Sequence, residues 1–364
     1  LFAQAARAAI DRYAPNPDII HLNSWQTGLV ALLLKRQKSD VTGPAPKITF
    51  AIYDAKEEAL FDQGMLDEFR LGYEHFTPEG IEYYGEVSLQ KAGVVFADLT
   101  MTCSPNYAQE IQTELAGGGL SGLYAAMDKK LVGVLCGLNN ESWNPETDQR
   151  ITATYDRTEL EGKSDCKQAL LRELGLPTKA DAPLVAMIGP FSKRSGINLV
   201  LDTASQWLEF GFQMVFFGED DDHQVNRQLK KLASKHSDSV SVQPYPNNLR
   251  QILAGVDALI TPSLIEPTGL LQFKAMRYGV IPVVHAAGAL TDTVVDFDSP
   301  TATGTGICFS ALGEDGLLTA LGRLSSLFKS SKKWRVLVQN TMRQEFSWET
   351  TAMRYEQLLS IHKD

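Results

Sequence analysis

The chain has 364 residues, of which 44% are hydrophobic and 21% are charged, and its formal net charge is -10 at pH 7. This length exceeds one ordinary hydrophobic core and fits two globular domains. The negative charge argues against a nucleic-acid-binding protein, because such a protein presents a basic stripe to the phosphate backbone. No apolar run approaches the roughly 20 residues that a membrane-spanning helix needs.

The cysteines and histidines are scattered along the chain. The four cysteines form no CxxC pair; they are Cys103, Cys136, Cys166 and Cys308. This spacing speaks against a zinc site or a disulfide framework and fits a reducing compartment. We therefore expect no metal, no cofactor and no secretion. The chain starts at Leu1 inside a helical pattern, so we expect it to be part of a longer polypeptide whose targeting segment is out of view.

Short apolar runs alternate with helical patterns, which is typical of βα units around parallel sheets. The strands expected first are Asp18–Leu22, Lys47–Tyr53, Leu99–Cys103 and Leu131–Leu135. A second set is Leu184–Ile188, Gln213–Phe217, Ala258–Thr261 and Ile281–His285. The 3.6-residue period predicts helices at Gln26–Arg36, Tyr107–Leu115, Cys166–Leu174, Ile197–Glu209, Leu249–Ala254, Leu270–Tyr278, Glu314–Phe328 and Thr351–Ile361.

The two sets of elements are separated by a polar segment with two prolines, Gly175–Pro183. We expect the domain boundary there, after residue 177. The sequence thus predicts an α/β protein with two lobes. In such proteins the ligand binds in the cleft at the carboxyl ends of the strands.

The most informative stretch is Thr261–Gly279, which reads TPSLIEPTGLLQFKAMRYG. A strand-like run ends there, and the turn Glu266–Gly269 opens an amphipathic helix. A helix opened this way directs backbone N–H groups and the positive end of its dipole at one point. That point suits an anion such as a phosphate. The sequence therefore predicts an anion site here, with the Glu266 carboxylate at its rim.

This stretch resembles the EPCGL-type donor loop of glycogen and starch synthases, which are retaining glycosyltransferases. Six further segments resemble that family in the same order. They are PDIIH with WQTGL (Pro17–Leu29), EYYG with KAG (Glu82–Gly93), SPNYAQEI (Ser104–Ile111), WNPETD (Trp143–Asp148), GTG (Gly304–Gly306) and FSW (Phe346–Trp348). The chain is therefore identified as a member of the glycogen and starch synthase family.

The resemblance implies a GT-B fold, an α/β fold of two Rossmann-like lobes with the donor site in the inter-lobe cleft. Residues 1–177 would form an acceptor-side lobe that lacks its start, because the family's KxGGL loop lies upstream of Leu1. Residues 178–345 would form the nucleotide-sugar lobe. Residues 346–364 would form a C-terminal helix that returns to the first lobe.

The family transfers glucose from ADP-glucose or UDP-glucose to the non-reducing end of an α-1,4-glucan. Charge builds on the leaving diphosphate, so cations and N–H donors should dominate catalysis. In the family, an arginine and a lysine of an RLTxQKG loop supply the cations. Here Pro190 and Ser195 stand in their places. Lys193 and Arg194 are the candidate substitute cations, and they require a one-residue slip of the loop.

Other site residues follow from the resemblance. A family histidine that contacts the sugar is replaced by Asn23. Glu266 is kept and is assigned to the donor glucose, with helix capping as its alternative role. Tyr245 stands where a family tyrosine stacks on adenine, with an ordinary surface tyrosine as the alternative. The donor-binding residues implied are Gly218, Tyr245, Pro267, Thr268, Gly269 and Leu270.

Two functions remain open. The combined substitutions at Asn23, Pro190 and Ser195 favour a pseudoenzyme, which would bind glucan and serve as a regulatory or structural subunit of a larger assembly. The alternative is an active α-1,4-glucan synthase that uses ADP-glucose. The expected partners are α-1,4-glucan, ADP-glucose and other proteins of such an assembly. The expected location is the cytoplasm of a bacterium or the plastid stroma.

Overall fold

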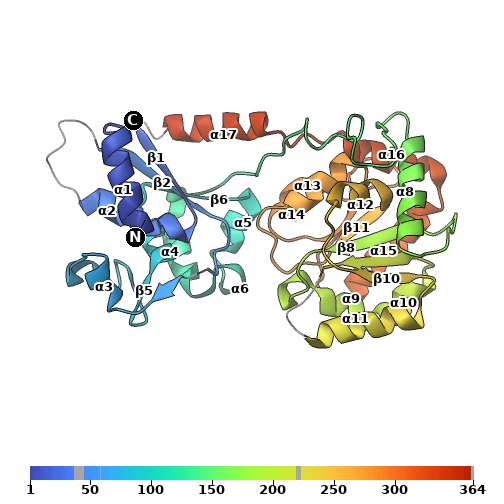
Figure 1. Cartoon of the computed structure of the whole chain (residues 1–364), viewed down its shortest axis with the longest axis horizontal. Coiled ribbons are helices and arrows are strands. Elements are labelled where there is room, and N and C mark those ends of the chain that lie inside the picture. Colours follow the sequence, from blue (N-terminus) through green and yellow to red (C-terminus); the bar gives the residue numbers. More distant parts are fainter. Residues whose placement is uncertain (37–44, 58, 219–222, 362–364) are drawn as a thin grey trace. The chain divides into compact units, whose positions relative to one another are not determined.

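Two parallel β-sheets, each with its own helices, organise the chain (Figure 1). The computed structural model describes residues 1–36, 45–57, 59–218 and 223–361. Contacts divide them into a first unit, residues 1–135 with those from Met353 onward, and a second unit, residues 136–352. The expected α/β fold with Rossmann-like lobes is confirmed, because both main sheets are parallel and flanked by helices.

The first unit is built on a four-stranded parallel sheet in the order β1-β2-β6-β7. Its strands are β1 (Ile19–Asn23), β2 (Lys47–Ile52), β6 (Leu99–Thr102) and β7 (Leu131–Gly133). The two central strands are buried along nearly their whole length, which explains their continuous apolar runs. A small antiparallel sheet beside them contains β3 (Leu60–Phe61), β5 (Glu86–Ser88) and β4 (Glu82–Tyr83).

Serine caps begin two helices of the first unit. The Ser88 hydroxyl accepts from the Lys91 N–H at 3.1 Å, and the Ser104 hydroxyl accepts from the Tyr107 N–H at 2.8 Å. The helices are α1 (Phe2–Tyr13), α2 (Gly28–Arg36), α3 (Met65–Glu68), α4 (Leu89–Phe96), α5 (Pro105–Glu110), α6 (Glu114–Gly117) and α7 (Ser121–Ala126). Short 3-10 turns are η1 (Trp25–Thr27), η2 (Tyr73–His75), η3 (Gly118–Leu120) and η4 (Asp128–Lys130).

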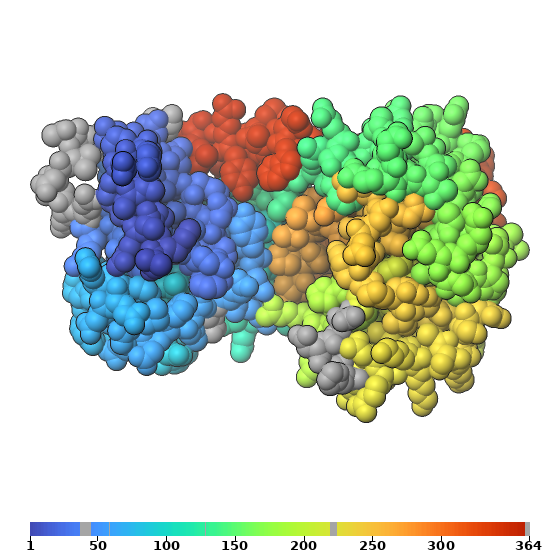
Figure 2. All heavy atoms as spheres, in the orientation of Figure 1, coloured from blue at the N-terminus to red at the C-terminus, as the bar shows by residue number. Residues whose placement is uncertain are grey.

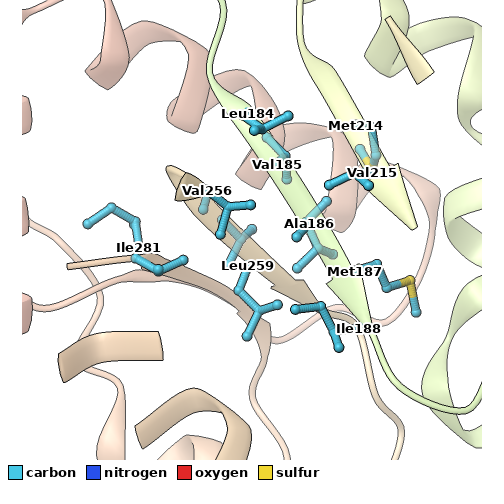
Figure 3. Close-up of a cluster of buried hydrophobic side chains, with 14 of the residues drawn as sticks. Leu184, Val185, Ala186, Met187, Ile188, Met214, Val215, Val256, Leu259 and Ile281 are labelled. Atoms are coloured by element: carbon cyan, nitrogen blue, oxygen red, sulfur yellow. The ribbon is translucent and has the colours of Figure 1, made fainter. Parts of the chain in front are cut away.

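The second unit is built on a six-stranded parallel sheet in the order β10-β9-β8-β11-β12-β13. Its strands are β8 (Leu184–Ile188), β9 (Gln213–Phe217), β10 (Val240–Gln243), β11 (Ala258–Thr261), β12 (Ile281–His285) and β13 (Ile307–Phe309). Every residue of β8 and β9 is buried. Figure 3 shows the side chains of β8 packing among those of neighbouring elements in this core.

Helices surround this second sheet. They are α8 (Glu161–Glu173), α9 (Ile197–Asp202), α10 (Ala204–Glu209), α11 (His223–Lys235), α12 (Leu249–Gly255), α13 (Leu270–Arg277), α14 (Ala289–Thr293), α15 (Glu314–Phe328) and α16 (Ser331–Met342), with the 3-10 turn η5 (Lys193–Ser195). The last helix, α17 (Trp348–Ile361), follows α16 along the chain. The expected helix Ile197–Glu209 is two helices, because Thr203 lies between them and its hydroxyl donates to the Leu199 carbonyl. Helix α11, yellow in Figure 2, lies at the surface.

The division between the units lies upstream of the limit expected after residue 177. Helix α8 belongs to the second unit, since its Cys166 and Leu170 are buried in that unit's core. A Cβ on Gly255 of α12 would lie only 2.7 Å from Leu170 Cδ2, so the two helices pack closely. The polar segment after α8 is thus a surface loop inside the second unit.

Helix α17 has residues in both units. From Met353 onward it belongs to the first unit. The Tyr355 ring meets the His21 ring edge-on with 5.8 Å between centroids, and Leu358 is buried beside Leu99 and Met101. None of the helices in the described ranges is long and apolar enough to cross a membrane.

Candidate functional site

A cavity of about 200 Å³ lies at the carboxyl ends of β8 and β11 in the second unit. Parallel α/β sheets bind ligands at this edge, where loops leave the strands. One wall comes from the loop after β8 and includes Gly189, Pro190, Phe191, Ser192, Arg194 and Ser195. The other comes from the turn after β11 and the start of α13, and includes Pro262, Ser263, Ile265, Glu266, Gly269 and Gln272.

These two walls are joined through their main chains. The Leu264 N–H donates to the Arg194 carbonyl oxygen at 2.9 Å. Gly196, with φ +75°, comes so close to the turn after β11 that an added Cβ would lie 2.2 Å from the Pro262 carbonyl oxygen. Only glycine fits this left-handed conformation and this approach without strain. The loop after β8 is therefore held against the turn that carries Glu266.

A third loop, after β12, holds the main chain of Glu266. The Ala289 N–H donates to the Glu266 carbonyl oxygen at 2.8 Å. An added Cβ on Gly288, whose φ is +49°, would lie 2.1 Å from that same oxygen. Glu266 is thus fixed by contacts from outside its own turn.

The Glu266 side chain lies at the N-terminus of α13. Its Oε1 accepts the Gly269 N–H at 3.1 Å, and the backbone and hydroxyl of Thr268 also hydrogen-bond to the carboxylate. Burial raises the pKa of the Glu266 carboxyl above its usual range, while these hydrogen bonds oppose the shift. The carboxylate therefore adopts the capping geometry considered as its alternative role, and it also lines the cavity. From there it can accept hydrogen bonds from the hydroxyl groups of a bound sugar.

Of the two candidate substitute cations, Arg194 lines the cavity and Lys193 is not among its lining residues. Pro190 and Ser195, the residues that replace the expected arginine and lysine, both line it. The Ser195 hydroxyl donates to the Ser192 carbonyl oxygen at 2.8 Å, within its own turn. Among the described residues that line the cavity, Arg194 is the basic one.

The other expected donor residues are distributed more widely. Gly218 follows β9 with φ +145°, and an added Cβ would lie 1.9 Å from the Gly189 carbonyl oxygen, so it supports the loop after β8. Tyr245, 56% exposed, lines a separate cavity of about 330 Å³ at the ends of β9 and β10. Pro267, Thr268 and Leu270 adjoin the Glu266 cavity, but of this turn's later residues only Gly269 lines it.

Asn23 belongs to the first unit, at the end of β1. Its Oδ1 accepts the Tyr53 hydroxyl at 2.9 Å. In the part of the chain that the structure describes, no three His, Cys, Asp or Glu side chains gather where they could hold a metal ion.

Sequence reasoning missed several residues around the cavity. Gln272 lines it from α13, where its Oε1 accepts the Thr293 hydroxyl at 3.0 Å. Its position three residues after Gly269 could have indicated it, since residues three apart share a helix face. Ser263 and Leu290 also line the cavity, and only the folded loops bring them there.

Comparisons with known proteins agree with this architecture. The family model of the starch synthase catalytic domain matches residues 1–126, and that of glycosyl transferases group 1 matches residues 175–334. A glycogen synthase from Anaeromyxobacter sp. (strain Fw109-5) is 36% identical over 98% of this chain and 76% of its own length. One from Cellvibrio japonicus (strain Ueda107) is 38% identical over 98% of this chain and 74% of its own length.

Among solved structures, the catalytic domain of starch synthase IV from Arabidopsis thaliana, bound to ADP and acarbose, is similar with a TM-score of 0.91. It is 31% identical, and the alignment covers 100% of this chain and 76% of that one. The chain therefore belongs to the glycogen and starch synthase family of GT-B glycosyltransferases.

Proposed function

We propose that the chain is an α-1,4-glucan synthase that transfers glucose from ADP-glucose, and that the Glu266 cavity receives the sugar and diphosphate of the donor. The observation that carries this proposal is that Arg194 lines the same cavity as Glu266 and Gly269. The relatives named glycogen synthase support the reaction, and the ADP bound to the Arabidopsis enzyme supports the donor. These relatives favour an active synthase over the pseudoenzyme that the loop substitutions favoured.

In the proposed mechanism, the two walls of the cavity have separate roles. The Arg194 guanidinium is always charged and offers several donors in a plane, so it can bind a phosphate with two hydrogen bonds. The N-terminus of α13 adds the positive end of its dipole. Both stabilise the charge that develops on the leaving diphosphate. The Glu266 carboxylate orients the glucose by accepting hydrogen bonds from its hydroxyls.

A second candidate function is glucan binding without turnover. The observation in its favour is that Pro190 and Ser195 carry no charge, and that the Ser195 hydroxyl is bonded within its own turn. In this candidate the chain keeps the fold to bind α-1,4-glucan, as a regulatory or structural subunit with other proteins.

The deciding experiment measures incorporation of labelled glucose from ADP-glucose into glycogen, with UDP-glucose in parallel. We expect incorporation by the wild-type chain and losses of about 10²–10³-fold for Arg194→Ala and Glu266→Ala. Lys193→Ala is the matched control, because the neighbouring lysine does not line the cavity. No incorporation by a folded chain that still binds glycogen would contradict the synthase and support the second candidate.

The proposed location follows the relatives, which are bacterial glycogen synthases and a plant starch synthase. The cytoplasm of a bacterium and the plastid stroma are accordingly the two proposed compartments.

A further inference from the structure

His285, the last residue of β12, contacts the turn that carries Glu266. Its Nδ1 lies 2.8 Å from the Ser263 carbonyl oxygen. A carbonyl oxygen can only accept, so Nδ1 carries the proton and donates it. This assignment holds for the neutral ring and for the protonated ring alike.

The bonded carbonyl belongs to the peptide group between Ser263 and Leu264. The N–H of the same peptide group donates to the Arg194 carbonyl oxygen at 2.9 Å. One peptide plane is thus held at both ends, by His285 on one side and by Arg194 on the other. Ser263 itself is 7% exposed and lines the cavity. A rotation of this peptide would therefore displace the Arg194 main chain and the wall that carries Glu266.

The imidazole is in turn held by the neighbouring strand. The Phe309 ring of β13 lies 5.7 Å from it, centroid to centroid, at 49°. The main chains are joined next to this contact, since the Ala286 N–H donates to the Phe309 carbonyl oxygen at 3.0 Å. His285 is partly buried and is not among the residues that line the cavity. Its contact with the residues that line the cavity is therefore the hydrogen bond to the Ser263 carbonyl oxygen.

We propose that His285 is a positioning residue of the donor site: its Nδ1–H fixes the Ser263–Leu264 peptide and so sets the place of Arg194 relative to Glu266. This role rests on the proposed glucosyl transfer for its effect on activity. The hydrogen bond itself is independent of that reaction and can be measured in the resting protein.

The test uses two amides that differ in reach. In Asn the side-chain nitrogen is as many bonds from Cβ as Nδ1 is in His, whereas in Gln it lies one bond farther. His285→Asn should therefore keep the donor to Ser263, and His285→Gln and His285→Ala should lose it. The first readout is hydrogen exchange of the Leu264 amide. We expect slow exchange in the wild type and His285→Asn, and exchange at least about tenfold faster in the other two.

The second readout is glucose transfer from ADP-glucose. Displacements of about 1 Å around a reacting centre cost up to about 10²-fold, so we expect kcat of His285→Gln and His285→Ala to fall by about tenfold to hundredfold. His285→Asn should stay within about threefold of the wild type. Phe309→Leu is the packing control, since it removes the ring contact and leaves the hydrogen-bonding groups in place.

The outcomes separate the two proposals. Equal Leu264 exchange in His285→Gln and the wild type, or equal losses in His285→Asn and His285→Ala, would overturn the positioning role. A wild-type chain that transfers no glucose would refute the proposed synthase. In that case the exchange of the Leu264 amide still decides whether His285 positions the loop.

Discussion

The Leu264 N–H donates to the Arg194 carbonyl oxygen at 2.9 Å, and this bond joins the loop after β8 to the turn after β11. Arg194 and Glu266 lie on different βα connections, far apart in sequence, yet they line one cavity. Because the bond uses main-chain groups, it does not depend on which side chains the loop carries. The framework of the site is therefore retained although Pro190 and Ser195 replace charged residues of the family pattern.

Gly196→Ala should destabilise the second unit strongly. The new methyl group would need φ near +75° and would lie about 2.2 Å from the Pro262 carbonyl oxygen. Gly211→Ala is the matched control, because Gly211 has φ +80° and nothing within 4 Å of an added Cβ. We expect the control to cost about 1–2 kcal/mol from backbone strain, and Gly196→Ala about 3 kcal/mol or more. Urea unfolding measures the free energy of unfolding of both variants. Equal decreases would show that the close contact with the Pro262 carbonyl oxygen adds nothing to the effect of the left-handed backbone conformation.

Ser195→Lys should raise glucose transfer. Ser195 lines the cavity and stands where the family pattern has a lysine, so the new ammonium group would reach the developing diphosphate charge. One preorganised charge donor is worth about 10²–10³-fold in rate, and we expect an increase of about tenfold or more. Lys193→Ser combined with Ser195→Lys keeps the loop charge constant as a control. An unchanged rate in both variants would mean that charge at position 195 does not act on the donor.

Glu266→Gln should stabilise the second unit at neutral pH and impair transfer. Burial raises the pKa of Glu266 in the folded state, so ionisation is harder in the folded chain than in the unfolded one. The carboxylate therefore costs stability as the pH rises from the unfolded value, about 4.5, through the folded value. Glutamine keeps an oxygen for the Gly269 N–H and removes this cost.

Two measurements check the Glu266 prediction. Other carboxyls with shifted pKa values, such as Asp148 and Glu345, keep their contribution to the acidic pH dependence of unfolding. The difference in unfolding free energy between wild type and Glu266→Gln should therefore change with pH above about 4.5, the ordinary pKa of Glu266. Transfer at pH 7 should fall by about tenfold or more, the usual effect of losing one charged hydrogen bond. If Glu266→Gln were less stable than the wild type at pH 7, burial would not be the main cause of the raised pKa of Glu266.

Lys163 should make the stability of the second unit depend on pH in the alkaline range. Burial lowers its pKa from 10.5 to about 8, so the charged amine is disfavoured in the folded chain. Below pH 8 the folded chain carries the full free-energy cost of burying the charged amine. As the pH rises from about 8 to 10.5, the folded chain loses this proton before the unfolded chain does, and the protein becomes more stable. Its Nζ donates to the carbonyl oxygens of Val256 at 3.0 Å and Tyr278 at 2.9 Å.

Lys163→Met should abolish this alkaline rise in stability. The same variant leaves buried carbonyls without their donor, which costs about 1–3 kcal/mol at neutral pH. Lys179→Met, at an exposed lysine, is the control and should show neither effect. Thermal unfolding between pH 7 and 10.5 is the measurement, and parallel curves for Lys163→Met and wild type would contradict the prediction.

Much of the fold could be predicted from the sequence. The strands β8, β9, β11 and β12 have the bounds that their apolar runs predicted, because strands buried on both faces leave uninterrupted hydrophobic runs. The short strands β10 (Val240–Gln243) and β13 (Ile307–Phe309) were missed, because edge strands of three or four residues leave little pattern. The contact-based division between the units lies upstream of the limit expected after residue 177. A polar loop looks alike between domains and within one, so the sequence gives no signal that would distinguish the two positions.

The sequence by itself determined the family, the two parallel sheets and the turn that carries Glu266. These depend on local patterns and on the order of motifs along the chain. Only the tertiary structure decided that Arg194, and not Lys193, lines the cavity. It also revealed that His285 and Arg194 bond the two ends of one peptide group. Such contacts join residues from separate strands, so their geometry is decided by how the sheet brings its loops together and leaves no periodic signal in the chain.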